Sequence, residues 1–299
     1  MKILTDDDLQ NIDILCGAHA LRKFLIAAYT GQTISPPRVA IDLEPDALAI
    51  TAGSDQKNFG FRAYSYRQEL ERDKEDQIVA CWERETHDLT ALAIGERLGA
   101  WRTGILGGLC YEALTFKNKG TCGIIGTGLQ AYTQARAIAA LTKPSEFIVY
   151  SKDAERRTAF AERLEADADI KTSASSDAET VVRRSDTLTV VTNSSEPVFD
   201  VGWLDQCSHV TTVGPKRVTQ HETPVEIAEW ADVAVSDSPQ QIISQGSSHF
   251  LADTGLLATI EHLGSKFFGE NEGLFRKRTL YLSAGLSGTE VALLAALTA

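Results

Sequence analysis

The chain has 299 residues, 43% of them hydrophobic and 23% charged, and a formal net charge of −12. This composition predicts a folded globular protein long enough for two domains, and its acidic balance argues against nucleic acid or an anionic membrane as the main partner. The five cysteines form no C-x-x-C pair, and there is neither a basic and apolar leader nor an apolar run of about 18 residues, so we expect buried thiols, a cytoplasmic location and no membrane span.

The first 119 residues predict an α+β domain. A helix is expected over residues 6–29, where leucine and isoleucine recur at near-helical spacing. Short extended segments bounded by turn signals follow, at 38–43, 47–51, 59–66 and 77–82. A helix over 94–114 then leads to a hinge at 117–120.

A dinucleotide-binding turn is predicted where an apolar strand ends in Gly126-x-Gly128-x-x-Ala131 and a helix begins at once. Gly126 permits a tight turn, Gly128 lets the backbone approach a pyrophosphate, and Ala131 lets the helix pack close to the strand. The first N–H groups of the helix then face the phosphates. An ordinary βα turn is the alternative, but 143–145 closes the helix and 146–150 supplies a second strand, which completes a β-α-β unit.

The residues after that second strand favour NADP, with NAD as the other possibility. An acidic residue here bonds the ribose hydroxyl of NAD, whereas basic residues accommodate a 2′-phosphate. This chain has Ser151 and Lys152, with Arg156 and Arg157 one helical turn further on. Ser151 can donate to the phosphate, and the cations can supply charge. The alternative is a solvated helix face, since acidic residues lie among these cations.

Strand and helix continue to alternate up to about residue 285, as a doubly wound parallel sheet requires. Strands are expected at 187–192, 209–213 and 232–236, and helices at 154–165, 177–184 and 223–230. We expect the cofactor to contact the glycine turn and the loops that follow the strands. The expected contacts are Gly126, Thr127, Gly128, Leu129, Gln130, Ser151, Lys152, Arg156, Thr192, Asn193, Val213 and Gly214.

The order of several motifs along nearly the whole chain resembles the ornithine cyclodeaminase / mu-crystallin family of NAD(P)-dependent proteins. The matching pieces are Pro37-Arg38-Val39, Gly60-Phe61-Arg62, Gly99-Ala-Trp-Arg102-Thr103-Gly104, the glycine turn with Gln130 before Ala131, Val149-Tyr150-Ser151-Lys152, Thr192-Asn193-Ser194, Val213-Gly214-Pro215-Lys216 and Leu282-Ser283-Ala284-Gly285-Leu286. The resemblance implies a homodimer. In it, the first domain and the last segment of the chain together form the dimer interface and the floor of the substrate-binding site.

The resemblance places Arg38 and Arg102 where the family binds the substrate carboxylate. A guanidinium suits that role because it binds a carboxylate through two parallel hydrogen bonds. Glycines surround Arg102 on its helix, which indicates that another group approaches closely. The alternative for Arg102 is a surface ion pair.

Two positions depart from the family pattern. Arg62 stands where the family usually has a lysine, and an arginine cannot shuttle a proton near neutral pH. Lys216 stands where ornithine cyclodeaminases carry an aspartate for the distal amine, which disfavours ornithine and makes Lys216 a candidate proton donor. His221 is a second candidate. The alternative is that His221 and Glu222 cap the next helix.

The sequence therefore predicts an α/β protein with a Rossmann dinucleotide-binding domain, 120–285, inserted in an α+β dimerisation and substrate domain, 1–119 with 286–299. The expected function is NADPH-linked reduction of the imine of a small 2-oxo or cyclic imino acid, or oxidation of the amino acid, with Arg62, Lys216 and His221 as the catalytic candidates. Two alternatives are conversion of ornithine to proline with release of ammonia, and a nucleotide-dependent binding protein without turnover. No motif indicates a metal site.

Overall fold

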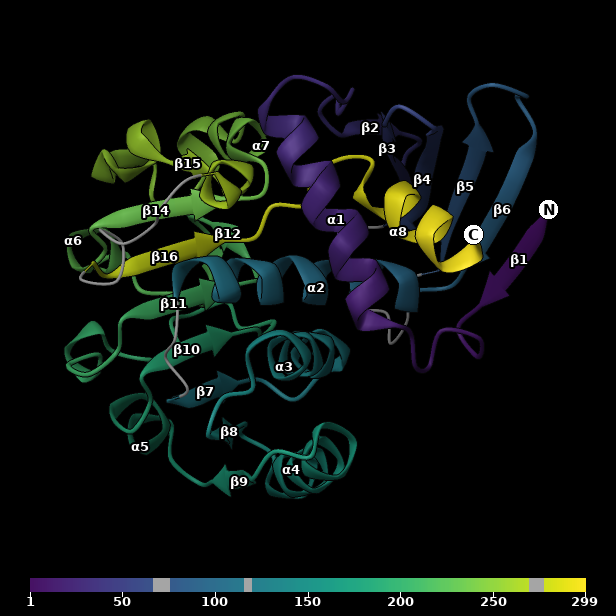
Figure 1. The fold of residues 1–299 in the computed structure, drawn as a ribbon. Coiled ribbons are helices and arrows are strands. Elements are labelled where there is room, and N and C mark those ends of the chain that lie inside the picture. Colours follow the sequence, from purple (N-terminus) through teal and green to yellow (C-terminus); the bar gives the residue numbers. More distant parts are fainter. Residues whose placement is uncertain (67–75, 116–119, 269–276) are drawn as a thin grey trace. The chain divides into compact units, whose positions relative to one another are not determined.

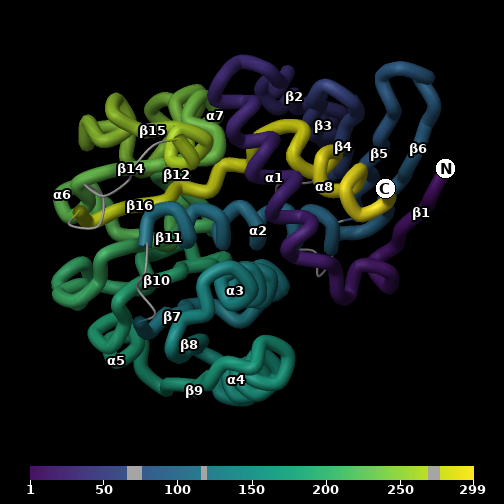
Figure 2. The backbone as a smooth tube through the Cα atoms, in the orientation of Figure 1, coloured from purple at the N-terminus to yellow at the C-terminus, as the bar shows by residue number. Residues whose placement is uncertain are grey.

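The computed structural model describes residues 1–66, 76–115, 120–268 and 277–299. The chain divides into two compact units, which Figures 1 and 2 trace by residue number. Unit 1 comprises Met1–Arg102 and Gly285–Ala299, and unit 2 comprises Thr103–Ala284. Apart from Gly120, the expected hinge at 117–120 lies outside the described residues.

Unit 1 is built on a six-stranded sheet with the order β1-β6-β5-β4-β3-β2. Neighbouring strands in this sheet are antiparallel, except that β1 is parallel to β6. Helix α8 packs on one face of the sheet and α1 packs on α8 (Figure 1). The bounds are β1 Lys2–Thr5, α1 Ile14–Tyr29, β2 Val39–Asp42, β3 Ala47–Ser54, β4 Asn58–Tyr66, β5 Gln77–Glu83, β6 Leu89–Ile94 and α8 Thr289–Thr298.

The first helix is shorter than the leucine spacing predicts. It begins at Ile14 rather than at residue 6, because Asp13 is its N-cap and accepts a hydrogen bond from the backbone N–H of Cys16. Residues 2–5, which precede the predicted helix, form a strand. The expectation that all five cysteines are buried is wrong for Cys16, which lies exposed on this helix.

The two ends of the chain meet in unit 1. Figure 2 shows the N- and C-termini near each other, and Lys2 Nζ donates a hydrogen bond to the carbonyl oxygen of Thr298. Because α8 covers the sheet formed by the first part of the chain, residues 285–299 belong to the core of unit 1. Val291, Leu293 and Leu294 of α8 are buried there.

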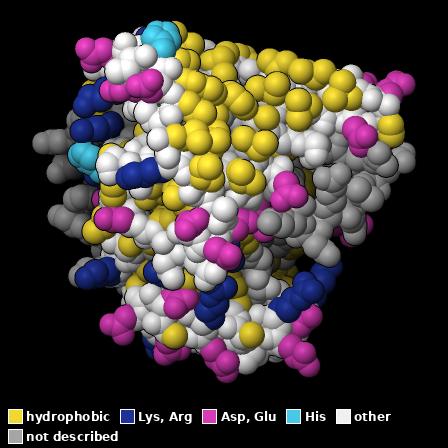
Figure 3. Space-filling view, turned by 90° about the vertical axis from the view of Figure 1, so that its right-hand side faces the viewer, with side chains coloured by type: hydrophobic (Ala, Val, Ile, Leu, Met, Phe, Trp, Pro, Cys, Tyr) yellow, Lys and Arg dark blue, Asp and Glu magenta, His cyan; other side chains and the backbone are white. Residues whose placement is uncertain are grey.

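The other face of this sheet exposes a row of large apolar side chains. Ile3, Val39, Ile41, Ile78 and Ile94 are each at least 40% exposed. Ile78 pairs directly with Ile94, so their side chains lie on the same face of the sheet. Figure 3 shows a broad area of hydrophobic side chains on this side of the molecule. A continuous apolar surface of this kind is typical of a protein interface.

Unit 2 contains an eight-stranded parallel sheet with the order β15-β14-β16-β11-β10-β7-β8-β9. Helices cover its faces (Figure 1), as a parallel sheet requires. The strands are β7 Thr121–Ile125, β8 Glu146–Tyr150, β9 Thr172–Ser175, β10 Thr187–Val190, β11 His209–Thr212, β14 Val233–Ser236, β15 Glu261–His262 and β16 Thr279–Leu282. The Rossmann-like α/β fold predicted from the sequence is confirmed.

Helices, a hairpin and 3₁₀ segments complete the unit. The helices are α2 Arg97–Leu114, which contains the boundary between the units, α3 Leu129–Thr142, α4 Ala154–Ala168, α5 Ala178–Arg183, α6 Ile227–Trp230 and α7 Pro239–Ile243. Strands β12 Lys216–Arg217 and β13 Gln220–His221 form a hairpin. Single 3₁₀ turns occur at Val201–Trp203, Gly246–Ser248, Ala252–Thr254, Leu256–Thr259 and Leu263–Phe267.

The glycines near Arg102 serve helix packing. A Cβ added to Gly104 would come within 2.6 Å of atoms of Thr133, and one added to Gly108 would come 2.8 Å from the Cβ of Ala137. Both contacts are with α3, so the close approach expected from the sequence comes at these positions from a neighbouring helix. Bare backbone here lets α2 and α3 pack closely.

Candidate functional site: a nucleotide turn and a buried arginine pair

The glycine turn of unit 2 has the geometry that nucleotide binding needs. Gly126 has φ +121°, and a Cβ there would lie 2.2 Å from the carbonyl oxygen of Val191. Gly128 differs, because it has an ordinary φ of −84° and a Cβ there would meet no atom within 4 Å. Gly126 is therefore required by the protein backbone, whereas Gly128 leaves space in front of the N-terminus of α3.

Gln130, in the first turn of α3, adds a second indication of a ligand. Its Oε1 atom is buried and has no hydrogen-bond partner among the described residues. The N-cap residue Gly128 has no side chain to cap the helix, so the first N–H groups of α3 receive no side-chain acceptor from that position. Open space, helix N–H groups and a buried acceptor together fit a dinucleotide at this turn.

Ser151 and its neighbours lie at the end of β8. The Ser151 hydroxyl donates to the carbonyl oxygen of Asp153 at 3.1 Å, and Arg157 Nη1 donates to the carbonyl oxygen of Ser151 at 3.1 Å. Asp153 is the N-cap of α4 and pairs with the largely exposed Arg156 at 3.7 Å. The nearest acid is therefore already engaged, while Lys152 is exposed. This arrangement is compatible with a phosphate at the strand end.

Glu222 joins the two strand-end loops that carry the other predicted cofactor residues. Its side chain is completely buried and accepts five hydrogen bonds. The donors are the N–H and hydroxyl of Thr192, the hydroxyl of Thr212, and the N–H groups of Val213 and Gly214, at 2.5 to 3.2 Å. A carboxylate with this many donors fixes both loops.

The role of Glu222 corrects the prediction that His221 and Glu222 cap a helix. Helix α6 begins only at Ile227, with Glu226 at its N-cap. The backbone donors of Thr192, Val213 and Gly214 are directed at Glu222, whereas Asn193 is exposed. Sequence reasoning missed Glu222 because its partners come from two distant strand ends.

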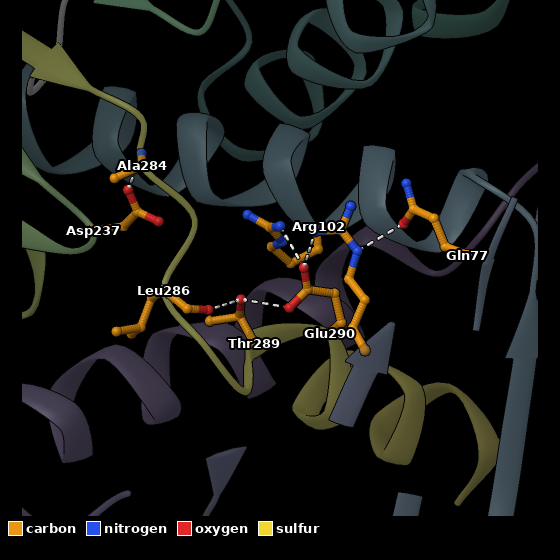
Figure 4. A network of polar contacts seen from close by, with 8 residues as sticks. Gln77, Arg102, Asp237, Ala284, Leu286, Thr289 and Glu290 are labelled. Carbon is orange, nitrogen blue, oxygen red and sulfur yellow. Dashed lines mark hydrogen bonds and ion pairs between the residues drawn. The ribbon is translucent and has the colours of Figure 1, made fainter. Parts of the chain in front are cut away.

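The substrate-binding candidates of unit 1 are partly gathered in a buried cluster (Figure 4). Arg62 on β4 donates from Nη1 to Oε1 of Glu290 at 3.2 Å, and Arg102 on α2 donates from Nη2 to the same oxygen. Arg62 Nε also donates to Oε1 of Gln77 at 2.8 Å. The three charged residues are between 2% and 8% exposed. Arg102 is thus in an ion pair, as the alternative from the sequence held, but a buried one.

The electrostatics keep this cluster charged. Burial lowers the pKa of Arg62, and the nearby carboxylate of Glu290 opposes that shift. Burial by itself raises the pKa of Glu290, but the attraction of Arg102 and Arg62 outweighs it and holds that pKa below its ordinary value. Glu290 is therefore ionised at neutral pH.

The sequence predicts Arg38 at this site, but the structure places it outside the cluster; Glu290 lies in the cluster although the sequence analysis did not predict it. Arg38 is exposed and lies just before β2, outside the buried cluster, although its charge contributes to lowering the pKa of Arg62. Glu290 did not enter the predicted site. One signal was available, since Glu290 is the single charged residue between positions 285 and 299. An isolated acid in an apolar helix needs a buried partner.

The proton-donor candidates lie on the hairpin of unit 2, where Lys216 pairs with His221. Lys216 is 8% exposed, and its Nζ donates to the carbonyl oxygen of Gly214 at 2.9 Å. Burial lowers its pKa to about 8, although Glu222 and Asp237 oppose the shift. Asp237 accepts a hydrogen bond from the N–H of Ala284 at 2.8 Å (Figure 4). Lys216 can therefore exchange a proton near neutral pH.

His221 is less suited to donate. Its Nδ1 lies 2.9 Å from the carbonyl oxygen of Thr223, which can only accept, so the neutral ring carries its proton on Nδ1. The ring stacks on Phe250 with centroids 5.1 Å apart. Neutral His221 therefore presents an acceptor at Nε2.

Within the described ranges, no group of three or more His, Cys, Asp or Glu side chains is placed to hold a metal ion. The helices in those ranges include none that is both long and apolar enough to cross a bilayer.

Comparison with known proteins gives relatives in sequence and in fold. A Δ1-pyrroline-2-carboxylate reductase of Bacillus cereus is 30% identical over 207 residues, which are 67% of this chain and 63% of that protein. The structure of the Thermococcus litoralis Δ1-pyrroline-2-carboxylate reductase in complex with NADH and L-proline superposes with a TM-score of 0.85 at 23% identity, covering 100% of this chain and 96% of that one.

An archaeal alanine dehydrogenase dimer with bound NAD shares the fold as well, with a TM-score of 0.80 at 21% identity over 99% of this chain and 94% of that one. The model of the ornithine cyclodeaminase/mu-crystallin family matches residues 13–297. That match spans the two units and includes the glycine turn, Arg62, Arg102 and Glu290. This chain therefore belongs to the ornithine cyclodeaminase/mu-crystallin family.

Proposed function

We propose that this chain is an NAD(P)-dependent oxidoreductase that reduces the imine of a small 2-oxo acid or cyclic imino acid, or oxidises the corresponding amino acid. The observation that carries the proposal is the buried pair of Arg62 and Arg102, which share one carboxylate oxygen of Glu290. The name of the Bacillus cereus relative supports a substrate of the same class.

The charges of this cluster favour an anionic ligand. Arg62 and Arg102 both contact the one carboxylate of Glu290, whose charge acts on Arg62. Guanidinium groups brought together in a buried site attract an anion, and a two-point contact of a substrate carboxylate with a guanidinium would fix the orientation of the neighbouring α-carbon.

The remaining chemistry needs a hydride and a proton. When bound, a nicotinamide cofactor supplies the hydride. Lys216 is the proposed proton donor, because its lowered pKa lets it give up a proton near neutral pH. Arg62 cannot take this role, and His221 directs its Nδ1 proton to a backbone carbonyl.

The end of β8 supports NADP as the preferred cofactor. Lys152 is exposed, and the neighbouring acid Asp153 is engaged as a helix cap and in an ion pair with Arg156. The cations can attract a 2′-phosphate, which NADH lacks. The Thermococcus litoralis structure contains NADH, so the choice between the two cofactors is measured directly in the test of function.

The test is a panel of 2-oxo acids with ammonia or methylamine, and of cyclic imino acids, each supplied with NADPH or NADH. We expect cofactor oxidation with at least one small imino acid and tighter binding of NADPH. The rate should fall as the pH rises through about 8, because Lys216 loses its proton there, and Lys216→Met should abolish that fall. Absorbance of the reduced cofactor gives the rates.

Two outcomes would contradict the proposal. If no member of the panel oxidises either cofactor while ornithine yields proline and ammonia, the protein is a cyclodeaminase. If small carboxylic acids bind but nothing turns over, it is a nucleotide-dependent binding protein. The cation Lys216 argues against the first outcome, since it would repel the distal ammonium of ornithine.

We also propose that the exposed apolar face of unit 1 forms the interface of a homodimer. Ile78 and Ile94, which pair directly, are 48% and 46% exposed, and exposure of this kind marks interaction surfaces. Light scattering should give the mass of a dimer, and the double substitution Ile78→Glu with Ile94→Glu should give a monomer. If light scattering shows that the wild-type protein is a monomer, the proposed dimer interface is wrong.

A further inference from the structure

The two buried arginines are organised by an acid that belongs to the protein itself. Glu290 accepts from Arg62 and Arg102 through a single oxygen, Oε1, and the helix α8 brings it from a position 228 residues beyond Arg62 (Figure 4). Its other oxygen, Oε2, lies 3.4 Å from the Thr289 hydroxyl, whose shorter contact is to the carbonyl oxygen of Leu286 at 2.6 Å. The Glu290 charge is therefore directed at the arginines.

This geometry fixes the guanidinium group of Arg62. Arg62 is held at Nε by Gln77 and at Nη1 by Glu290, and its guanidinium lies 4.3 Å over the ring of Tyr64. Its Nη2 forms no hydrogen bond with the residues that the structure describes. A side chain held at two nitrogen atoms has little freedom, so its third nitrogen has a defined direction.

Glu290 also limits the charge that the arginines present. The energy of a ligand in the field of a fixed charge scales with the charge of the ligand, and the field is strong where water is excluded. A buried negative charge beside the arginines therefore opposes a dicarboxylate about twice as strongly as a monocarboxylate.

We propose that Glu290 is a positioning residue that holds the arginine pair for a substrate carboxylate and lowers the affinity for acids with two carboxylates more than for acids with one. The inference rests on the proposed function, because it assumes that Arg62 and Arg102 bind a carboxylate.

The test compares binding of propionate and succinate by calorimetry, with saturating NADPH, in the wild type and in Glu290→Gln. Glutamine can still accept hydrogen bonds from both arginines but carries no charge. We expect the variant to bind both acids more tightly than wild type does, with a gain for succinate about tenfold larger than for propionate. Glu85→Gln, an exposed acid of the same unit, is the matched control and should leave the ratio unchanged.

Two further variants keep the test decisive if Glu290→Gln does not fold. Glu290→Asp keeps the charge and should keep the wild-type ratio. Glu290→Ala should melt at a lower temperature, and formate should restore its melting temperature more than it raises that of wild type, because formate replaces the lost carboxylate. A shifted ratio in Glu290→Asp, or no selective rescue by formate, would overturn the inference.

The outcomes separate this inference from the proposed function. If Glu290→Gln keeps the wild-type ratio, or Glu85→Gln changes it equally, Glu290 does not set the charge selectivity, although the arginines still bind carboxylates. If wild type binds neither propionate nor succinate, the carboxylate site itself is wrong, and the proposed function loses its main support.

Discussion

Arg102→Ala should lower kcat/KM by about a hundredfold to several thousandfold, because removing one partner of a buried charge pair typically costs about 3–5 kcal/mol. The substrate carboxylate would enter a buried site without one of its two guanidinium groups. Arg102→Lys should recover part of the loss, since it keeps the charge but lacks the planar fork. Steady-state kinetics with the best substrate of the panel measures both effects.

The ion pair with Glu290 adds a second expected result for Arg102→Ala. The melting temperature should also fall, because Glu290 would retain only Arg62 as a cationic partner in the cluster. Cofactor affinity should hardly change, since the nucleotide turn is formed within unit 2. Arg97→Ala, earlier on the same helix, is the control. A lower melting temperature with near-normal kcat/KM would assign Arg102 a structural role only.

Gly128→Val should abolish measurable nucleotide binding, with a loss of roughly a hundredfold or more in affinity, while the fold survives. The backbone at Gly128 has an ordinary φ of −84°, so valine causes no strain there, and its Cβ meets no protein atom within 4 Å. The added side chain would occupy the space in front of α3 that we assign to the pyrophosphate. Nicotinamide fluorescence titration gives the affinity.

Gly126→Ala is the matched comparison for that experiment. Its φ of +121° and a Cβ contact of 2.2 Å with the Val191 carbonyl oxygen predict a loss of folding stability instead. The two variants should therefore differ in melting temperature: that of Gly126→Ala should fall, and that of Gly128→Val should stay close to wild type. Unchanged cofactor affinity in a folded Gly128→Val would remove the nucleotide site from this turn.

Local sequence signals predicted the strand and helix around the glycine turn of unit 2, but β9, β15 and β16 were not predicted. The strand before Gly126 and the helix after it depend on neighbouring residues, and the structure places β7 and α3 there. Helix starts were harder, because leucine spacing continues before the true beginning of α1 at Ile14. The N-cap Asp13 determines where α1 begins, and residues 2–5 are held in a strand by pairing with β6. The pairing with β6 is a long-range contact, which local sequence signals do not show.

The polar side chains that organise the site could not be predicted in the same way. Glu222 binds loops that lie up to 30 residues away, and Glu290 binds arginines 188 and 228 residues away. Such partners become neighbours only through the topology of the sheets. Arg62 and Arg102 could be named as candidates because their motifs are local, whereas Glu222 and Glu290 meet their partners only in the complete fold.

The order of residues in unit 1 has a consequence for synthesis on the ribosome. All strands of the parallel sheet lie between residues 121 and 282, so unit 2 can fold as soon as that stretch has emerged. The sheet made from the first 102 residues must wait for α8, and until then Arg62 and Arg102 lack the Glu290 carboxylate. The nascent chain should therefore complete its second unit before its first, and until then the amino-terminal sheet lacks the helix that covers it.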